Sequence, residues 1–329
     1  MSALEDQAPI DCTQQSGVQN FPQPESSQPP QPESPPQSRI TFTILDNPIN
    51  SNHFAVAQQQ QRSGEDRFQT KQFGSFRYYA VFDGHGGSRK MGPKHIGDYL
   101  TQHLHERLAV SLHEINSNLV ADTIKRVFID LDAEMKNLNL EFGSTATVVL
   151  VDDKEGIIYQ ANLGDSRSAI IDEQGTILSV TKDHEPGDPI ETARVENAGG
   201  IVVMMQGANR VDGSLAVARA FGDFEFKQNN DVPYDPINGK VSVVPDVTIL
   251  PKPVHPFYIM LTSDAPYGNN RFTVQGLIKM FESNTRTIVF TDKNPDSQLT
   301  QIAEDMVKQI QPITSDDITV ILVFNGANK

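Results

Sequence analysis

Short runs of apolar and β-branched residues recur along the chain and predict β-strands. The clearest run, Phe76–Phe82, passes directly into Asp83-Gly84-His85-Gly86-Gly87, which has the composition of a tight turn. The other runs that predict strands are Ile40–Leu45, Thr145–Val151, Gly156–Asn162, Arg167–Ile171, Thr176–Thr181, Val241–Val244, Phe257–Thr262 and Ile318–Phe324. Several of these runs are separated only by a few turn-forming residues, so we expect neighbouring strands to pair as antiparallel hairpins.

Apolar residues that recur at three- and four-residue steps predict helices between these strands. Residues 119–138 show the pattern best, and its apolar positions are Val120, Ile124, Val127, Leu131, Met135 and Leu138. Helices are also predicted over 88–112, with a break at Gly92-Pro93, and over 189–198, 272–283 and 296–310. Long helices between groups of short strands favour an antiparallel α+β fold over alternating βαβ units.

The first 38 residues differ from the rest of the chain. They hold eight of its 21 prolines, mixed with glutamine and serine, and few large apolar side chains. Such a segment cannot offset the entropy of ordering, so residues 1–38 are predicted to be a disordered tail. Pro29-x-x-Pro32 and Pro32-x-x-Pro35 are candidate ligands for a proline-recognising domain, although a solvated tail is the simpler interpretation. Residues 39–329 contain no Gly/Ser/Pro-rich linker and are predicted to form a single domain.

The chain is acidic, with 27 Lys and Arg against 42 Asp and Glu, which gives a net charge of −15. A protein that binds nucleic acid or an anionic membrane surface by charge is usually basic, so neither partner is expected. No segment has the pattern of a signal peptide or a transmembrane helix. Cys12 is the only cysteine, which excludes an internal disulfide and favours a cytoplasmic or nuclear location.

Carboxylates mark the ends of three predicted strands. Asp83 follows Phe76–Phe82, Asp264 follows Phe257–Thr262, and Asp316-Asp317 precede Ile318–Phe324. A further pair, Glu65-Asp66, comes shortly before the first of these strands. Strand ends can meet at one edge of a sheet, where neighbouring carboxylates repel each other unless they are protonated or bridged by a cation. Oxygen ligands favour Mg²⁺, Mn²⁺ or Ca²⁺, although each Asp taken alone could simply cap a turn.

Two further groups of polar residues need an interpretation. Asp130, Asp132, Glu134 and Glu141 match part of a calcium-binding loop, but the required glycine is Met135, so we interpret them as the solvated face of the helix over 119–138. His85 lies two residues after Asp83, where a histidine could protonate a leaving group. The alternative is a turn histidine that hydrogen-bonds to the backbone.

Eight motifs in order resemble the metal-dependent serine/threonine protein phosphatase family, type 2C (PPM), between about residue 62 and residue 325. They are Ala80–Gly87, Gly143–Ala146, Ala161–Arg167, Asp183–Pro186 with Glu191, Arg194 and Ala198–Gly200, then Gly213–Asp223, Pro245–Val247, Ser263-Asp264 and Asp316-Asp317. The resemblance implies a central β-sandwich of two antiparallel sheets, flanked by α-helices on both sides in an α-β-β-α arrangement.

The resemblance also implies the roles of individual residues. Asp83 would bridge two Mg²⁺ or Mn²⁺ ions, Glu65 and the Gly84 carbonyl would hold one ion, and Asp264 and Asp316 would hold the other. Asp165, with Asp264, corresponds to a third, weaker ion, so two or three ions are expected. Asp66 would support the metal ligands without being a primary ligand itself. His85 would be the general acid, and Arg62 is a candidate for steering the phosphate.

The resemblance implies hydrolysis of phosphoserine and phosphothreonine in protein substrates by a water that bridges the two ions, carried out by a monomeric enzyme. Two departures from the family pattern are Ala265-Pro266-Tyr267-Gly268 after Asp264, and Asp317 where an asparagine is usual. The first motivates an alternative, a catalytically weak pseudophosphatase that serves as a phosphoprotein-binding module. A metal-dependent hydrolase of small phosphate esters is a third possibility.

Overall fold

The computed structural model describes residues 40–43, 52–60, 64–86, 95–227, 232–267, 272–273, 275–277, 279 and 295–326. The chain divides into two units, Met1–Gln37 and Ser38–Lys329, and every described residue belongs to the second. The predicted tail and its Pro-x-x-Pro motifs lie outside the described residues, as does Arg62.

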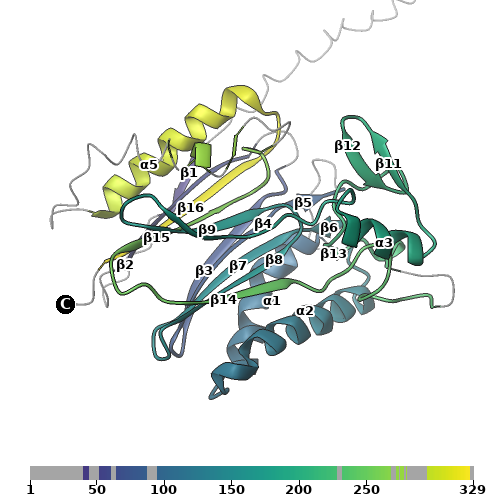
Figure 1. Ribbon diagram of the computed structural model, residues 1–329, viewed down its shortest axis with the longest axis horizontal. Coiled ribbons are helices and arrows are strands. Elements are labelled where there is room, and N and C mark those ends of the chain that lie inside the picture. Colours follow the sequence, from purple (N-terminus) through teal and green to yellow (C-terminus); the bar gives the residue numbers. More distant parts are fainter. Residues whose placement is uncertain are drawn as a thin grey trace, which may run out of the picture. The chain divides into compact units, whose positions relative to one another are not determined.

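Two antiparallel sheets form the centre of the second unit. One has five strands in the order β14 (Asp246–Pro251), β8 (Ile157–Leu163), β7 (Ala146–Asp152), β4 (Phe76–Phe82) and β3 (Arg67–Phe73). The other has six in the order β1 (Ile40–Thr43), β2 (Asn52–Gln59), β16 (Ile318–Asn325), β15 (Phe257–Thr262), β9 (Arg167–Asp172) and β10 (Ile177–Val180). Figure 1 shows the two sets of strands running across the molecule.

Successive residues of a central strand point alternately into two different apolar interiors. Tyr79 and Val81 of β4 pack in one buried cluster with Ile259 and Leu261 of β15, so the inner faces of the two sheets meet. The intervening residues of β4, such as Phe82, point to the opposite face and join the cluster formed with the helices. Because β4 is buried on both faces, six of its seven residues are aromatic or aliphatic, and the exception is the buried Arg77.

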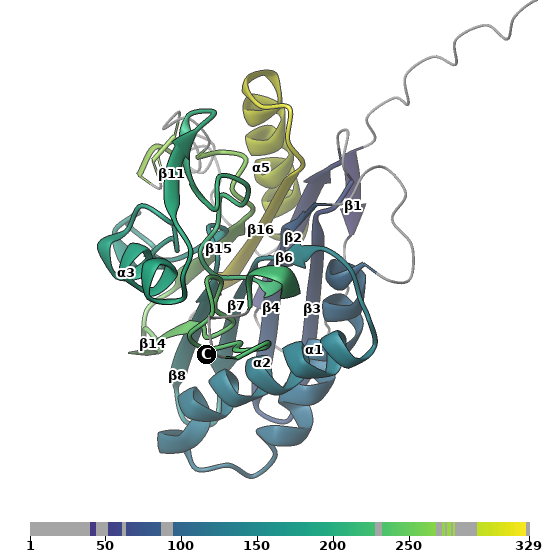
Figure 2. The ribbon, with the colours of Figure 1, turned by 90° about the vertical axis from the view of Figure 1, so that its right-hand side faces the viewer.

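Helices cover both outer faces of the sandwich. α1 (Ile96–Ser111) and α2 (Val120–Asn137) bury Leu104 and Phe128, among others, against the five-stranded sheet. α5 (Pro295–Ile310) buries Ile302 and Met306 against the six-stranded sheet. α5 therefore lies on one side of the strands and α1 and α2 on the other, as Figures 1 and 2 show. The α-β-β-α arrangement expected from the sequence is confirmed.

Smaller elements gather at one end of the sandwich. They are a sheet of β5 (Gly84–His85), β6 (Gly143–Ser144) and β13 (Phe221–Gly222), the hairpin of β11 (Val202–Met205) and β12 (Ala208–Val211), and α3 (Pro189–Asn197). Short 3-10 helices lie at η1 (Ser117–Leu119), η2 (Phe224–Phe226) and η4 (Gln311–Ile313). Figure 1 shows β5, β6 and β13 at the end that also carries α3 and the β11–β12 hairpin.

The strand predicted over Val241–Val244 is wrong. These four residues are all described and form no strand, and Ser242 makes only an isolated bridge to Arg219. The strand begins slightly later, at Asp246, where β14 pairs with β8 along the edge of the sheet. Val241 and Val243 are nevertheless fully buried, which explains their apolar character without a strand.

The solvated face predicted for α2 is wrong at Asp132. Asp132 has no exposed surface, and its carboxylate accepts hydrogen bonds from Gly222 N (2.8 Å), Lys227 Nζ (2.6 Å) and Tyr234 Oη (2.8 Å). Asp132 therefore ties α2 to the segment that contains β13 and η2.

In the part of the chain that the structure describes, no helix combines the length and apolar character needed to cross a membrane.

Candidate functional site

The pairing of the strands brings the predicted carboxylates to one edge of the sandwich. In the five-stranded sheet, Arg67 pairs with Phe82, so Asp66 and Asp83 extend from the same end of neighbouring strands. In the six-stranded sheet, Thr262 pairs with Val320, which places Ser263-Asp264 beside the start of β16. Because antiparallel neighbours begin and end at the same edge, residues far apart in the sequence meet there.

The charges of these carboxylates act on one another. Burial raises the pKa of Asp83 well above its usual value, and the charges of Asp66, Asp264, Asp165 and Asp316 raise it further. Burial is also the main cause that raises the pKa of Asp66 to about 8 and that of Asp264 to about 6. The pKa values of Asp165 and Asp316 are raised as well. Such a group of carboxylates carries an unfavourable negative charge that a cation would relieve.

The donor atoms of the cluster fit a hard divalent cation. Asp264 Oδ1 is buried and has no hydrogen-bond partner among the residues that the structure describes. Oxygen-only donors suit Mg²⁺ or Mn²⁺ better than zinc. Within the described ranges, no three His, Cys, Asp or Glu side chains are grouped closely enough to hold a metal ion. The site is therefore a set of neighbouring oxygen donors rather than a finished coordination sphere.

Asp317 and Thr319 hold the Glu65-Asp66 segment in place. The Asp317 carboxylate accepts hydrogen bonds from the backbone N–H groups of Glu65 (2.6 Å) and Asp66 (3.5 Å). Thr319 Oγ1 donates to Asp66 Oδ2 at 2.7 Å. The sequence placed Asp317 among the carboxylates at strand ends but did not show that its side chain connects two segments of the site.

His85 pairs with a carboxylate that sequence reasoning did not assign. Its Nε2 lies 2.7 Å from Asp223 Oδ2, and Asp223 is largely buried. Burial lowers the pKa of His85, but the charge and hydrogen bond of Asp223 outweigh it and leave the pKa above its usual value. A Cβ on Gly143 would lie 2.2 Å from both His85 Nε2 and Asp223 Oδ2, so the pair needs a glycine there. Asp223 ends the motif Gly213–Asp223, but spacing alone could not show that it pairs with His85.

The altered run after Asp264 forms a packed turn. Tyr267 N donates to the Asp264 carbonyl oxygen at 2.7 Å, and the Tyr267 hydroxyl hydrogen-bonds to Thr262 Oγ1 at 2.9 Å. The guanidinium of Arg167 lies 3.8 Å from the centroid of the Tyr267 ring. These contacts support the backbone of Asp264 although the usual family sequence is absent. Gly268 lies outside the described residues.

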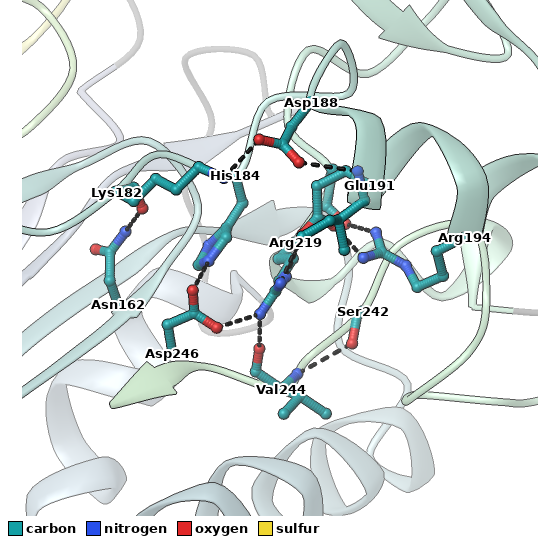
Figure 3. A network of polar contacts seen from close by, with 12 residues as sticks. Asn162, Lys182, His184, Asp188, Glu191, Arg194, Arg219, Ser242, Val244 and Asp246 are labelled. Carbon is teal, nitrogen blue, oxygen red and sulfur yellow. Dashed lines mark hydrogen bonds and ion pairs between the residues drawn. The ribbon is translucent and has the colours of Figure 1, made fainter. Parts of the chain in front are cut away.

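A partly buried polar network holds the turn that carries Asp165. Gly164 N donates to His184 Nδ1 at 3.1 Å, and His184 Nε2 lies 3.2 Å from Asp246 Oδ2. Arg219 donates to Asp246 Oδ1 (2.9 Å) and to Glu191 Oε1 (2.6 Å). Figure 3 shows His184, Glu191, Arg219 and Asp246 converging from α3, β14 and neighbouring loops. The motif residues His184, Glu191 and Arg219 therefore connect the Asp165 turn to α3 and β14.

An open pocket adjoins the carboxylate cluster. Its volume is about 490 Å³, and it is lined by Arg167, Lys182, Asp183, Glu185 and Asn209, among others. Arg167 and Asp183 form a bidentate ion pair at 2.6 Å on its wall. The charge of Asp183 raises the pKa of both Asp165 and Asp264, which places the pocket next to the cluster.

Eight of the nine site residues predicted from sequence are described, and Arg62 is the exception. The structure brings together Asp66, Asp83, Asp165, Asp264 and Asp316, and Glu65 lies beside them through its contact with Asp317. Gly84 follows Asp83 in β5, and a Cβ on it would lie 2.9 Å from the Glu65 carbonyl oxygen. Glu65 and Asp66 are nearly buried, whereas Asp316 is exposed at the rim.

Residues 46–264 match the family model described as Protein phosphatase 2C. The chain belongs to the protein phosphatase 2C family. The matched range includes Glu65, Asp83, His85, Asp165 and Asp264, whereas Asp316 lies beyond it. Membership in the protein phosphatase 2C family agrees with the resemblance recognised from the motifs.

Curated relatives match the chain over part of its length. Protein phosphatase 2C homolog 2 of Schizosaccharomyces pombe is 36% identical over 176 residues, which cover 52% of this chain and 44% of that protein. Human Protein phosphatase 1B is 35% identical over 167 residues, which cover 46% of this chain and 32% of that protein. The matched segment thus spans less than half of each of these two protein phosphatase 2C relatives.

Solved structures share the protein phosphatase 2C fold of this chain. A phosphatase from Toxoplasma gondii superposes with a TM-score of 0.68 at 22% identity, covering 85% of this chain and 95% of that chain. A sex-determining protein of C. elegans superposes with the same TM-score, 0.68, at 23% identity, covering 85% of this chain and 66% of that chain. The superpositions cover far more of this chain than the sequence matches do.

Proposed function

We propose that this protein hydrolyses phosphoserine and phosphothreonine in proteins with the help of Mg²⁺ or Mn²⁺. The observation that carries the proposal is the cluster of mutually repelling carboxylates, Asp66, Asp83, Asp165, Asp264 and Asp316, at one edge of the sandwich. Membership in the protein phosphatase 2C family supports it, as do relatives that are named protein phosphatases.

The proposed ligands divide between neighbouring ion sites. Asp83 would contribute to two ions, Glu65 and the Gly84 carbonyl to one, and Asp264 and Asp316 to the other. Asp165 would serve a third, weaker site together with Asp264, and Asp66 would orient the ligands from outside. Bound divalent ions supply Lewis-acid activation of water near neutral pH and offset negative charge on the phosphate.

The residues of the chain itself would handle the leaving group. Hydrolysis forms a bond between the water oxygen and phosphorus, and it breaks the bond from phosphorus to the serine or threonine oxygen. In our proposal, His85 gives a proton to that oxygen as it leaves. Asp223, 2.7 Å from His85 Nε2, would orient the imidazole and favour its protonated form. Arg62 stays a candidate for contacting the phosphate.

The open pocket supports a protein substrate. It adjoins the cluster and is lined partly by Asn209 of the β11–β12 hairpin, so residues beside a phosphorylated side chain could occupy it. Substrate choice would then depend on the loop from Lys182 to Asp188 and on this hairpin. A small phosphate ester would not need such a surface beside the site.

Release of phosphate from a phosphothreonine peptide, with and without Mn²⁺, tests the proposal. We expect turnover that requires the metal and is nearly abolished by Asp264→Ala. Turnover of small phosphate esters in preference to peptides would instead favour the metabolite hydrolase. Tight peptide binding without turnover at saturating Mn²⁺ would favour the pseudophosphatase, although the packed turn around Tyr267 still supports Asp264.

A further inference from the structure

His95 lies behind the candidate metal site in a closely packed position. It precedes α1 as the N-cap residue, and only 2% of it is exposed. One side of its ring faces Gly84, where an added Cβ would lie 2.7 Å from His95 Cε1. The Phe142 ring lies nearby, with its centroid 5.8 Å from that of His95. The imidazole has little room to change its orientation.

The capping hydrogen bond determines which ring nitrogen carries the proton. Gly97 N donates to His95 Nδ1 at 3.1 Å, so Nδ1 must offer a lone pair. A neutral imidazole with a free lone pair on Nδ1 carries its proton on Nε2. His95 Nε2 is therefore a hydrogen-bond donor.

The donor on His95 faces an acceptor on a predicted metal ligand. His95 Nε2 and Glu65 Oε1 are 3.7 Å apart, and both atoms are buried. Neither has a hydrogen-bond partner among the described residues. A buried donor and a buried acceptor that both lack partners are unfavourable, and a small rotation of the Glu65 carboxylate would satisfy both.

We propose that His95 is a positioning residue that donates from Nε2 to Glu65 Oε1 and so leaves Glu65 Oε2 directed at the cation. The inference rests on the proposed function, because it takes Glu65 as a ligand. Groups that hydrogen-bond to metal ligands fix their orientation, and their removal usually lowers metal affinity 10- to 100-fold. The same histidine would thus cap α1 with one nitrogen and orient a ligand with the other.

A pair of variants separates the two nitrogens. In His95→Asn the side-chain oxygen can still accept from Gly97 N, but no donor reaches Glu65. In His95→Gln the amide nitrogen can take the place of Nε2, while the capping acceptor is lost. Mn²⁺ binding by titration calorimetry and thermal unfolding of the metal-free protein are measured for both variants.

We expect His95→Asn to keep the thermal stability of the metal-free protein and to bind Mn²⁺ about tenfold more weakly or worse. His95→Gln should bind Mn²⁺ nearly as the unaltered protein does but unfold at a lower temperature. In a Glu65→Gln background, His95→Asn should weaken Mn²⁺ binding no further, because the carboxylate that it orients is gone.

Three results decide against the inference. His95→Asn that is folded and binds Mn²⁺ as tightly as the unaltered protein overturns it. Mn²⁺ affinity that falls equally in both variants, in step with thermal stability, shows a helix cap only and also overturns it. If the unaltered protein does not bind Mn²⁺ at all, the proposed function fails first, and the inference fails with it.

Discussion

The contact between His85 and Asp223 gives the proposed proton donor a carboxylate partner 138 positions away in the sequence. Asp223 lies in the left-handed region, with a φ of 49°, directly before η2. Its backbone N–H donates to the Phe142 carbonyl, which fixes it beside β6. The catalytic role proposed for His85 therefore depends on the backbone of a distant segment as well as on its own turn.

At the residue scale, we predict that Asp223→Asn lowers kcat more for a phosphothreonine peptide than for p-nitrophenyl phosphate. A threonine alkoxide needs a proton in order to leave, whereas nitrophenolate does not. General acids contribute about 10²- to 10⁴-fold, so we expect His85→Gln to lose at least about 100-fold on the peptide and Asp223→Asn to lose less. Steady-state kinetics at saturating Mn²⁺ measures both variants. Equal losses on the two substrates would contradict the role of the pair.

At the scale of elements, the ion pair between Asp132 and Lys227 joins α2 to the segment around η2. Both side chains are fully buried, and their atoms lie 2.6 Å apart. Asp132 also accepts from Gly222 N, the residue before Asp223. The pair therefore holds the element that presents Asp223 to His85.

We predict that Asp132→Ala lowers the free energy of unfolding by about 3–5 kcal/mol, because it leaves the Lys227 ammonium buried without its carboxylate. Urea denaturation measures the loss. Asp130→Ala, at an exposed position of the same helix, is the matched control and should change stability by less than about 0.5 kcal/mol. A loss no larger than that of the control would show that the buried pair contributes little.

The elements that could be predicted most accurately from the sequence are the strands that are buried on both faces. β4 and β15 begin and end where the sequence predicts, since every residue in them is buried. β2 and β3 were missed because they contain polar residues such as Gln58 and Gln69, which pair through long-range contacts. Asp83 and Asp264 were predictable as strand-end carboxylates because they follow the apolar strands β4 and β15.

The contacts that support the site were not predictable in the same way. Asp317 acts on Glu65 across 252 positions, and His95 approaches Glu65 through a ring orientation that depends on Gly84 and Phe142. Neither relation leaves a periodic signal in the sequence. They follow from how two sheets and a helix meet at one edge.

At the scale of the whole molecule, the carboxylate cluster links stability to pH and to metal. Folding raises the pKa of Asp66 to about 8 and that of Asp264 to about 6, from an ordinary value of 3.8. Between the ordinary and the raised values the folded state binds more protons than the unfolded state. The free energy of unfolding therefore falls as the pH rises through this window.

We predict that the metal-free protein becomes less stable between about pH 5 and about pH 8, and that Mn²⁺ offsets the loss because it binds the ionised carboxylates. Denaturant unfolding across this range, with Mn²⁺ or with a chelator, measures the effect. Asp66→Asn removes one of the titrating groups and should flatten the metal-free profile. Stability that increases with pH in the absence of metal would contradict the arrangement of the cluster.

The net charge of −15 also gains a partial explanation at this scale. Six acidic residues, Glu65, Asp66, Asp83, Asp165, Asp264 and Asp316, belong to the candidate site, and two divalent cations there would bring the charge to about −11 (−15 + 4). The anionic phosphate of a substrate would then meet a locally neutralised surface.

If the carboxylate cluster makes this protein a metal-dependent phosphatase, turnover must depend both on Mn²⁺ and on the cluster. Phosphate release from a phosphothreonine peptide is followed as Mn²⁺ is titrated into the metal-free protein and into Asp83→Asn, with folding checked by circular dichroism. We predict saturable, Mn²⁺-dependent turnover for the unaltered protein and almost none for the variant at any Mn²⁺ concentration. Turnover that is independent of Mn²⁺, or equal in the two folded proteins, would contradict the account.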